Sequence, residues 1–420
     1  MPLGALVRND LLRHAGIVFV GMLVVHVINL FFQMAVSRAL PASEYALLAA
    51  FLGVMMILQR PLLTLTTGLA RFSSLLIKEG RTGDVKRLLI KWLWWAGVPA
   101  ALLGMVIILG HQTIMTWLHL DRPEPLLVAG AILPALFWLP VVNGAGQGAQ
   151  LFKWCTAAAI GGALARLLLG AGFVWWLYPA CGWAMLGHGL GLYVTVGLLA
   201  AGIGWQLRAQ RRSTRPLPHL RGFLGYSFLA QLSFAVLMTA DVILVKHFVP
   251  LDTEFAYAAT LGRMVVFLPG AIVASMLPKV STRGAGSKEQ EQIFSTALRW
   301  TFVFVATSVI GVWLLAGPLA HLLFGIQDAS PYLTRMMGVM ATVMGLTAVL
   351  NVILNYHLAQ RRFHRTWPLI VCAGGYLAAS FLFHDTAWPI VIAAAVANAI
   401  ATLALWHRPP HDDPSFRKHP

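Results

Sequence analysis

Long apolar runs separated by short polar connections dominate the pattern of this chain. Strands of a membrane barrel would alternate apolar and polar positions, and these runs do not alternate. A helix needs about 20 mostly apolar residues to cross a bilayer, and lipid offers the backbone no hydrogen-bond partners. The pattern therefore predicts an all-α polytopic membrane protein with about twelve transmembrane helices. The predicted spans are 15–37, 44–75, 88–110, 125–149, 154–178, 183–206, 223–248, 254–278, 292–316, 332–358, 367–384 and 387–406.

The composition agrees with a protein whose main solvent is lipid. Hydrophobic residues make up 58% of the 420 residues and charged residues only 11%, with a mean hydropathy of +0.74. A soluble domain carries about 25% charged residues. The longest connection between spans is 208–222, which leaves no room for a soluble catalytic or ATP-hydrolysing domain. We therefore expect a transporter rather than an enzyme, with no cofactor.

The distribution of basic residues argues against a nucleic-acid partner, although the formal net charge is +16. With the N-terminus inside, nearly all lysines and arginines of the connections and tails fall on the inner side. The opposite side holds only Arg38, Arg122, Lys246 and Arg335. Basic residues of membrane proteins concentrate on the cytoplasmic side. This asymmetry predicts a multi-pass protein with both termini in the cytoplasm.

The predicted spans fall into two groups of six. A basic linker at 211–222 separates an N-terminal lobe (1–210) from a C-terminal lobe (223–406), and 407–420 forms a tail. An offset of 208 residues aligns Gln33 with Asp241 and Pro61 with Pro269. Six spans return the chain to its starting side, so the repeat is expected to be parallel. Transporters built from such repeats bind their substrates between the two halves.

Four predicted spans carry polar side chains at helical spacing. A charge at the centre of a transmembrane helix costs about 2.5–3.5 kcal/mol, so such side chains should face each other or a watery cavity. Two alternatives stay open: the neutral groups could simply join helices, and Arg71 could extend to the membrane surface. The polar positions are His26, Asn29, Gln33, Arg60, Thr64, Thr67, Arg71, Gln231, Asp241, Thr260 and Arg263.

Asp241 is the single carboxylate away from the ends of the predicted spans. It could form an ion pair with Arg263 or Lys246, bind a coupling proton or sodium ion, or contact sugar hydroxyls. We find no metal-ligand spacing and no paired nucleophile and base. The absence of paired intramembrane acids disfavours a membrane glycan polymerase or transferase.

Three segments resemble one family of membrane proteins. "DVILVKHFVPLDTEFAYAATLGRMVVFLPGAIVASMLPKVS" (241–281) resembles the seventh and eighth helices of Wzx-type polysaccharide or O-antigen flippases. These belong to the multidrug/oligosaccharidyl-lipid/polysaccharide (MOP) exporter superfamily. "SRALPASEYALLAAFLGVM" (37–55) resembles their first loop and second helix, and "GQGAQLFKW" (146–154) their motif after helix four.

The resemblance implies two six-helix lobes around a central cavity in a bacterial inner membrane, working by alternating access. The implied substrate is an undecaprenyl-pyrophosphate-linked oligosaccharide, moved from the inner to the outer leaflet for surface polysaccharide assembly, with polysaccharide polymerases as partners. Arg60, Arg263 and Arg71 would then bind the pyrophosphate, since arginine pairs with phosphate oxygens. The alternatives within the superfamily are a lipid II flippase and a cation-coupled multidrug antiporter.

Overall fold

The computed structural model describes residues 3–118, 120–208, 210, 224–266, 269, 270, 272, 276, 288–360 and 363–406, and within them it is helical without strands. The helices are α1 (Leu3–Ala39), α2 (Ala42–Lys78), α3 (Thr82–Leu109), α4 (His111–Leu118), α5 (Glu124–Gly148), α6 (Phe152–Trp176), α7 (Cys181–Gln206), α8 (Leu224–Phe248), α9 (Glu254–Met264), α11 (Lys288–Phe324), α12 (Pro331–Ala359), η1 (Phe363–Thr366), α13 (Trp367–Leu382) and α14 (Ala387–Trp406).

The all-α membrane fold predicted from the apolar runs is confirmed. Ten helices in the described parts of the chain are long and apolar enough to cross a membrane, and α13 is a shorter apolar helix of 16 residues. The predicted span 254–278 begins with α9, and much of its remainder lies outside the described residues, as do the linker 211–222 and the tail 407–420. Helix α11 is longer than predicted, and its backbone leaves helical geometry at Leu315.

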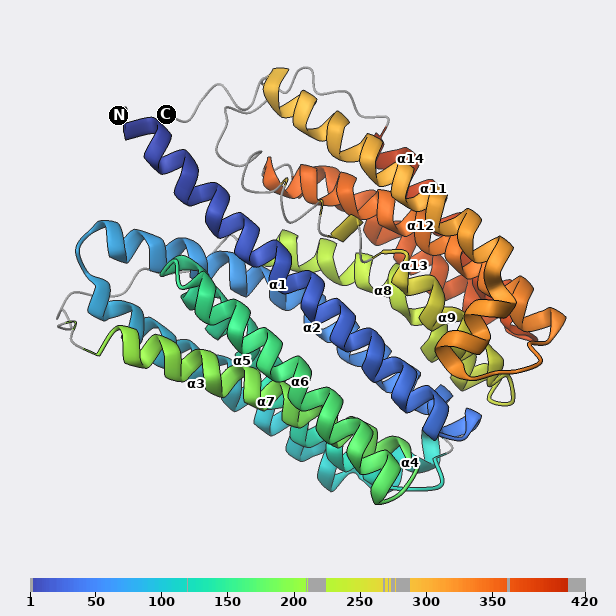
Figure 1. Cartoon of the computed structure of the whole chain (residues 1–420). Coiled ribbons are helices and arrows are strands. Elements are labelled where there is room, and N and C mark those ends of the chain that lie inside the picture. Colours follow the sequence, from blue (N-terminus) through green and yellow to red (C-terminus); the bar gives the residue numbers. More distant parts are fainter. Residues whose placement is uncertain are drawn as a thin grey trace.

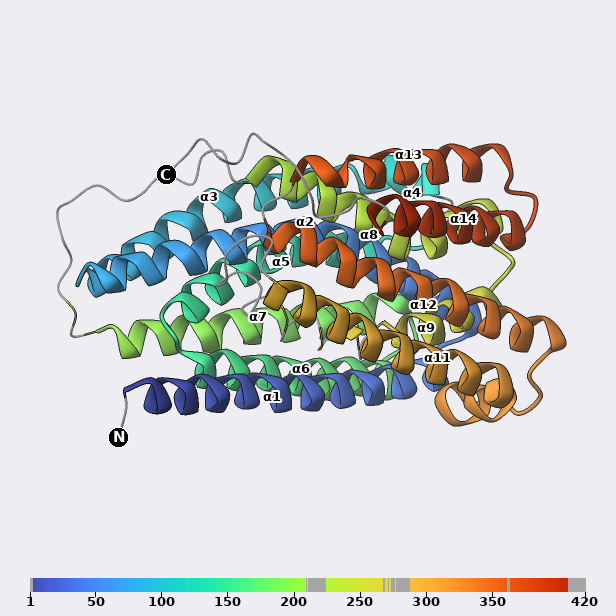
Figure 2. The same ribbon diagram turned by 90° about the horizontal axis from the view of Figure 1, so that it is seen from above.

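The helices form two groups with the same internal arrangement. In the first group, α3 and α2 pack on α5, α7 packs on α5 and α6, and α6 packs on α1. The second group repeats these contacts: α11 and α9 pack on α12, α14 packs on α12 and α13, and α13 packs on α8. Figures 1 and 2 show the first group in blue to green and the second in yellow to red. The contact pattern therefore has the parallel repeat that the sequence predicts.

Helices α2 and α8 form the main contact between the two lobes. Gly53 permits this contact, because a Cβ atom there would lie 3.0 Å from Val242 Cγ1 and 3.2 Å from Thr239 Cγ2. Thr239 and Val242, which flank Asp241 in the sequence, therefore lie where the two lobes meet.

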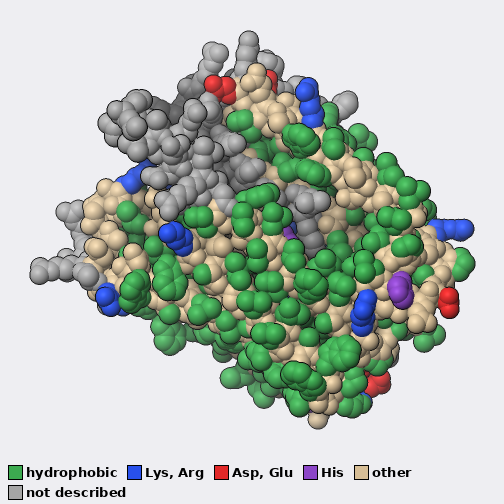
Figure 3. Space-filling view, viewed as in Figure 1, with side chains coloured by type: hydrophobic (Ala, Val, Ile, Leu, Met, Phe, Trp, Pro, Cys, Tyr) green, Lys and Arg blue, Asp and Glu red, His purple; other side chains and the backbone are tan. Residues whose placement is uncertain are grey.

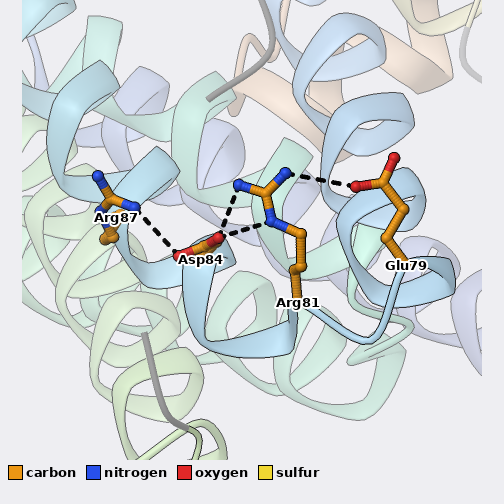
Figure 4. Close-up of polar contacts among 4 residues, drawn as sticks. All are labelled: Glu79, Arg81, Asp84 and Arg87. Carbon is orange, nitrogen blue, oxygen red and sulfur yellow. Dashed lines mark hydrogen bonds and ion pairs between the residues drawn. The ribbon is translucent and has the colours of Figure 1, made fainter. Parts of the chain in front are cut away.

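A compact ion-pair cluster fixes the turn between α2 and α3. The chain leaves α2 through Gly80, whose φ of 70° favours glycine. Asp84 is buried in the first turn of α3, where Arg81 Nη2 approaches it at 2.8 Å and Arg87 Nη1 at 3.3 Å (Figure 4). Arg81 also meets Glu79 at 3.4 Å. We call this end of the bundle the α2/α3 end; the basic-residue pattern predicts that it faces the cytoplasm.

The surface between the two ends is apolar. Hydrophobic side chains cover the middle of the face in Figure 3, and the charged side chains lie toward its periphery. Large side chains on the outer face of α3 are strongly exposed, among them Trp94 at 69% and Leu109 at 76%. Contiguous apolar surface of this kind marks contact with lipid or another apolar partner.

Candidate functional site

A buried ion pair lies inside the C-terminal lobe. Arg263 Nη2 of α9 donates to Asp241 Oδ1 of α8 at 2.6 Å. The two residues are only 8% and 3% exposed. Of the two cations considered as partners for Asp241, Arg263 is the one that makes the contact. Lys246 lies farther along α8 and is half-buried.

The pair leaves hydrogen-bonding capacity unused on both sides. Asp241 Oδ2 and Arg263 Nε are buried, and neither has a hydrogen-bond partner among the described residues. Tyr376 of α13 is buried close enough to interact electrostatically with both charges. Buried polar atoms are nearly always paired, so the unpartnered Oδ2 and Nε mark this ion pair as a candidate binding site.

Arg60 occupies a different position, at the contact between the lobes. Its Nη2 lies 3.5 Å from Met238 Sδ, and its guanidinium carbon lies 5.1 Å from the centre of the Phe234 ring. Both partners are on α8. A sulfur atom and an aromatic face stabilise the cation weakly compared with a carboxylate. Arg60 is half-buried, and neither of these partners carries a negative charge.

The other predicted positions of α2 are less closely associated with this site. Thr64 is buried and Thr67 exposed, and both hydroxyls donate to carbonyl groups of their own helix. Arg71 is exposed. It lies eleven residues beyond Arg60, which is about 16 Å along a helix axis. Arg71 therefore belongs near the α2/α3 end rather than beside the ion pair.

The predicted polar positions of α1 do not share one environment. Asn29 Oδ1 accepts a hydrogen bond from Arg166 of α6 at 3.2 Å. His26 and Gln33 are half-buried, and the buried Oε1 of Gln33 has no hydrogen-bond partner within the described parts of the chain. Gln231 of α8 is buried, and its Oε1 also has no hydrogen-bond partner among the described residues.

At the end opposite the α2/α3 turn, which we call the α1/α2 end, hydrogen bonds join the lobes. Ser37 Oγ donates to the carbonyl oxygen of Leu323 at 3.3 Å, and Arg38 Nη2 donates to that of Leu322 at 2.5 Å. Arg38 thereby supplies donors to the last carbonyl groups of α11, which have no partners within the helix. These contacts hold the first helix of one lobe against the other lobe.

Tyr45 connects this closure to the ion pair. Its hydroxyl donates to Thr260 Oγ1 at 3.0 Å, and its ring stacks on Tyr257 with centroids 4.6 Å apart. Thr260 precedes Arg263 by three residues on α9 and so shares its face. The sequence did not identify Tyr45, because an aromatic residue near a helix end reads equally well as part of a membrane-interface belt.

The C-terminal lobe contains a second polar connection that sequence reasoning missed. Thr347 Oγ1 of α12 donates to Asn398 Oδ1 of α14 at 3.1 Å. Asn398 Nδ2 in turn donates to the carbonyl oxygen of Leu237 on α8 at 3.3 Å. Thr347 and Asn398 form no polar stripe that the sequence shows, so only their tertiary contacts distinguish them. They hold α8 in place one turn before Asp241.

The comparisons with known proteins find similarity in structure but not in sequence. No family model and no curated protein matches the chain. The structure is similar to an outward-facing multidrug resistance MATE family transporter of the MOP superfamily, with a TM-score of 0.69 and 17% identity over 94% of this chain and 93% of that chain. An inward-facing transporter of that description gives 0.67 and 14%, over 91% and 93%. The MATE transporter ClbM in complex with Rb⁺ gives 0.65 and 16%, over 96% and 95%.

The chain has the MATE transporter fold. At these identities the likeness extends over nearly the whole backbone but carries no information about substrate. The MATE fold agrees with the two-lobe architecture expected from the sequence. Within that fold, the described contacts place one ion pair inside the second lobe, one arginine between the lobes, and a hydrogen-bonded closure at the α1/α2 end.

Proposed function

We propose that this chain is an alternating-access transporter that moves undecaprenyl-pyrophosphate-linked oligosaccharide from the inner to the outer leaflet of a bacterial inner membrane. The observation that carries the proposal is the excess of cationic groups on the helices that meet between the lobes. In the described structure Arg60 contacts a sulfur atom and an aromatic ring, neither of them charged, and Arg263 pairs with one carboxylate, Asp241. A pyrophosphate carries several negative charges, and guanidinium groups bind its oxygens in pairs.

The unused donor of Arg263 suggests how substrate could change the conformation. Arg263 Nη2 holds Asp241 while Nε has no partner in the described structure. A phosphate oxygen would bind Nε and compete with Asp241 for the cation. Thr260 lies on the same face of α9 as Arg263 and accepts the hydrogen bond from the Tyr45 hydroxyl. A shift of Arg263 would therefore weaken the closure at the α1/α2 end. Substrate would then favour opening through its stronger binding to the open state.

Arg71 fits this proposal as an earlier contact. It is exposed on α2, about three turns from Arg60 toward the α2/α3 end. A lipid-linked substrate arriving from the cytoplasmic side would meet Arg71 before it reached Arg60. The polar side chains of Thr67, Gln33 and His26 would offer hydrogen bonds to sugar hydroxyls along the same path.

A cation-coupled multidrug antiporter is the second candidate. Two of the structures with this fold are described as multidrug resistance transporters, and a third contains Rb⁺. In this reading Asp241 would bind the coupling proton or sodium ion. The three arginines on α2 and α9 favour the anionic substrate over an organic cation. A lipid II flippase would use the same pyrophosphate contacts and differ only in its glycan.

Leaflet exchange in proteoliposomes that contain a fluorescent lipid-linked oligosaccharide tests this proposal. A membrane-impermeant quencher added outside measures how much label reaches the outer leaflet. Wild type should expose internal label to the quencher, whereas Arg60→Ala and Arg263→Ala should not. Lysine at either position should restore part of the rate, because it keeps the charge but loses the paired geometry. Arg299→Ala is the matched control, since Arg299 is exposed on α11. Full exchange by the double alanine variant would contradict the proposal, and gradient-driven ethidium efflux would favour the antiporter.

The orientation in the membrane is part of the proposal. Both termini and the α2/α3 end would face the cytoplasm, where polysaccharide is assembled on the lipid, and a polymerase would receive the product outside. Cysteines at the exposed positions Asp328 and Lys78 test this arrangement. An impermeant thiol reagent added to intact cells should label Asp328→Cys and not Lys78→Cys. The reverse result would invert the direction of transport.

A further inference from the structure

The N-terminal lobe contains an arginine that the proposed substrate path does not use. Arg166 of α6 donates from Nη1 to Asn29 Oδ1 of α1 at 3.2 Å, and its guanidinium carbon lies 4.2 Å from the centre of the Phe32 ring. Its Nε is buried and has no hydrogen-bond partner among the described residues. A cation in the middle of a membrane helix is costly unless another group compensates its charge.

A histidine on α7 adjoins this arginine. Helices α6 and α7 touch through their backbones on both sides of Arg166, because a Cβ at Gly187 would lie 2.1 Å from Gly170 Cα and one at Gly191 would lie 2.7 Å from the Gly162 carbonyl oxygen. A Cβ at Gly191 would also lie 2.8 Å from Arg166 Cβ. His188 precedes Gly191 by three residues, so it shares the face of α7 that packs on Arg166.

His188 also has a buried ring nitrogen without a partner in the described structure. This atom is Nδ1, and the ring is close enough to interact electrostatically with Arg166. Arg166 Nε and His188 Nδ1 thus lie on adjacent helices, and neither has a hydrogen-bond partner among the described residues. Unpaired buried nitrogens of this kind are uncommon in native interiors. With the proton on Nδ1, both nitrogens are hydrogen-bond donors that lack an acceptor among the described residues.

Among the described residues, no carboxylate forms an ion pair with Arg166. The acidic side chains described in the N-terminal lobe lie at helix ends or in connections: Glu44, Glu79, Asp84, Asp121 and Glu124. Arg263 in the second lobe differs, because Asp241 balances its charge. The guanidinium of Arg166 therefore contacts an amide oxygen and an aromatic ring, and neither group carries a negative charge.

We propose that Arg166, His188 and Asn29 form a binding site for a small monovalent anion of the chloride class inside the N-terminal lobe. The anion would accept hydrogen bonds from Arg166 Nε and His188 Nδ1. One guanidinium balances one negative charge, so a monovalent ion leaves the site neutral and a phosphate would leave it negative. The close glycine contacts between α6 and α7 favour an ion of atomic size. The site is separate from the pyrophosphate contacts proposed for Arg60 and Arg263.

The test is thermal unfolding of the purified full-length chain in detergent, followed by tryptophan fluorescence, with gluconate replaced stepwise by chloride at constant ionic strength. An ion that binds the folded state raises the melting temperature with its concentration. We expect this rise in wild type. In His188→Leu the chloride concentration for half the effect should increase about tenfold, corresponding to one hydrogen bond to a charged group. Arg166→Met should abolish the effect.

The controls separate this site from the proposed transport function. Arg60→Ala should keep the full chloride dependence even where it stops lipid flipping, and so should the exposed-site variant Arg299→Ala. If Arg166→Met does not fold, crystals of wild type grown in bromide give an independent readout, with an anomalous peak expected within hydrogen-bond distance of Arg166 Nε. Melting that is independent of chloride, a dependence that Arg60→Ala removes, or the absence of that bromide peak would each overturn the proposal.

Discussion

Removing either charge of the Asp241–Arg263 pair should strongly destabilise the fold. The side chains meet at 2.6 Å with 4% and 10% of their surfaces exposed. Hydrogen bonds between membrane helices average about 0.6 kcal/mol, whereas removing one partner of a buried ion pair costs about 3–5 kcal/mol. The short distance and the burial place this pair in the second class. We therefore expect Asp241→Asn to lower the free energy of unfolding by about 3 kcal/mol and Arg263→Met by at least as much.

A double-mutant cycle measures the interaction itself. Unfolding of the purified chain by sodium dodecyl sulfate in mixed micelles, followed by circular dichroism, gives the free energy for each variant. The double variant Asp241→Asn/Arg263→Met leaves no unpaired charge, so it should be more stable than the sum of the single effects predicts. Residues in direct contact show interaction energies of about 0.5–3 kcal/mol, and we expect a value near the top of that range.

A matched pair of substitutions defines the result that would refute this reasoning. Asp328 is exposed between α11 and α12, so Asp328→Asn combined with Arg263→Met should be additive to within about 0.5 kcal/mol. If Asp241→Asn combined with Arg263→Met were equally additive, the two charges would not stabilise each other in the membrane. The account of substrate competing with Asp241 for Arg263 would then fail as well.

Two further predictions concern the closure at the α1/α2 end and the packing of α6 on α7. Tyr45→Phe keeps the ring stack on Tyr257 but removes the hydrogen bond to Thr260. Losing about 0.5–1.5 kcal/mol should increase the open population about 2- to 10-fold, measured as distances between spin labels across that end. Unchanged distances would exclude a role of Tyr45 in closure. Gly191→Ala forces a Cβ to within 2.7 Å of the Gly162 carbonyl oxygen and should cost about 1–3 kcal/mol of stability. Gly197→Ala on the same helix is the control: its Cβ meets no atom within 4 Å, so it should be neutral or stabilising. Equal effects of the two substitutions would refute the packing argument.

The helical architecture could be predicted from the sequence because lipid imposes a simple length requirement. Apolar runs near 20 residues must be helices, and their even number and basic connections fix a topology. The boundaries were less accurate where helices continue beyond the apolar core. Helix α11 extends to Phe324, for example, and its final carbonyl groups are bound by Arg38 from the other lobe. A contact between such distant segments leaves no local signal in the sequence.

The site was predictable only where one residue had few partners to choose from. Asp241 is the single acid away from the ends of the predicted spans, so its pairing with Arg263 on the next helix was one of a few possible ion pairs. Asn29 shows the opposite situation. It was grouped with the cavity side chains because of its helical spacing, yet the structure joins it to Arg166 on a helix with no polar stripe. Spacing identifies the face of one helix, whereas the partner depends on which helix lies against that face.

The internal repeat determines the backbone of the two lobes but not their charges. Asp241 corresponds to Gln33, and Arg263 corresponds to Met55, which is buried at 4% exposure. The ion pair of the second lobe therefore has no counterpart at the equivalent place in the first. Arg166, in turn, corresponds to Gly374 in the second lobe, where a Cβ would meet no atom within 4 Å. The two lobes share one fold but differ in charge. The second lobe holds the neutral Asp241–Arg263 pair, and the first holds Arg166, whose contacts are uncharged. Any substrate or ion held between them meets an asymmetric field, which a symmetric repeat by itself would not provide.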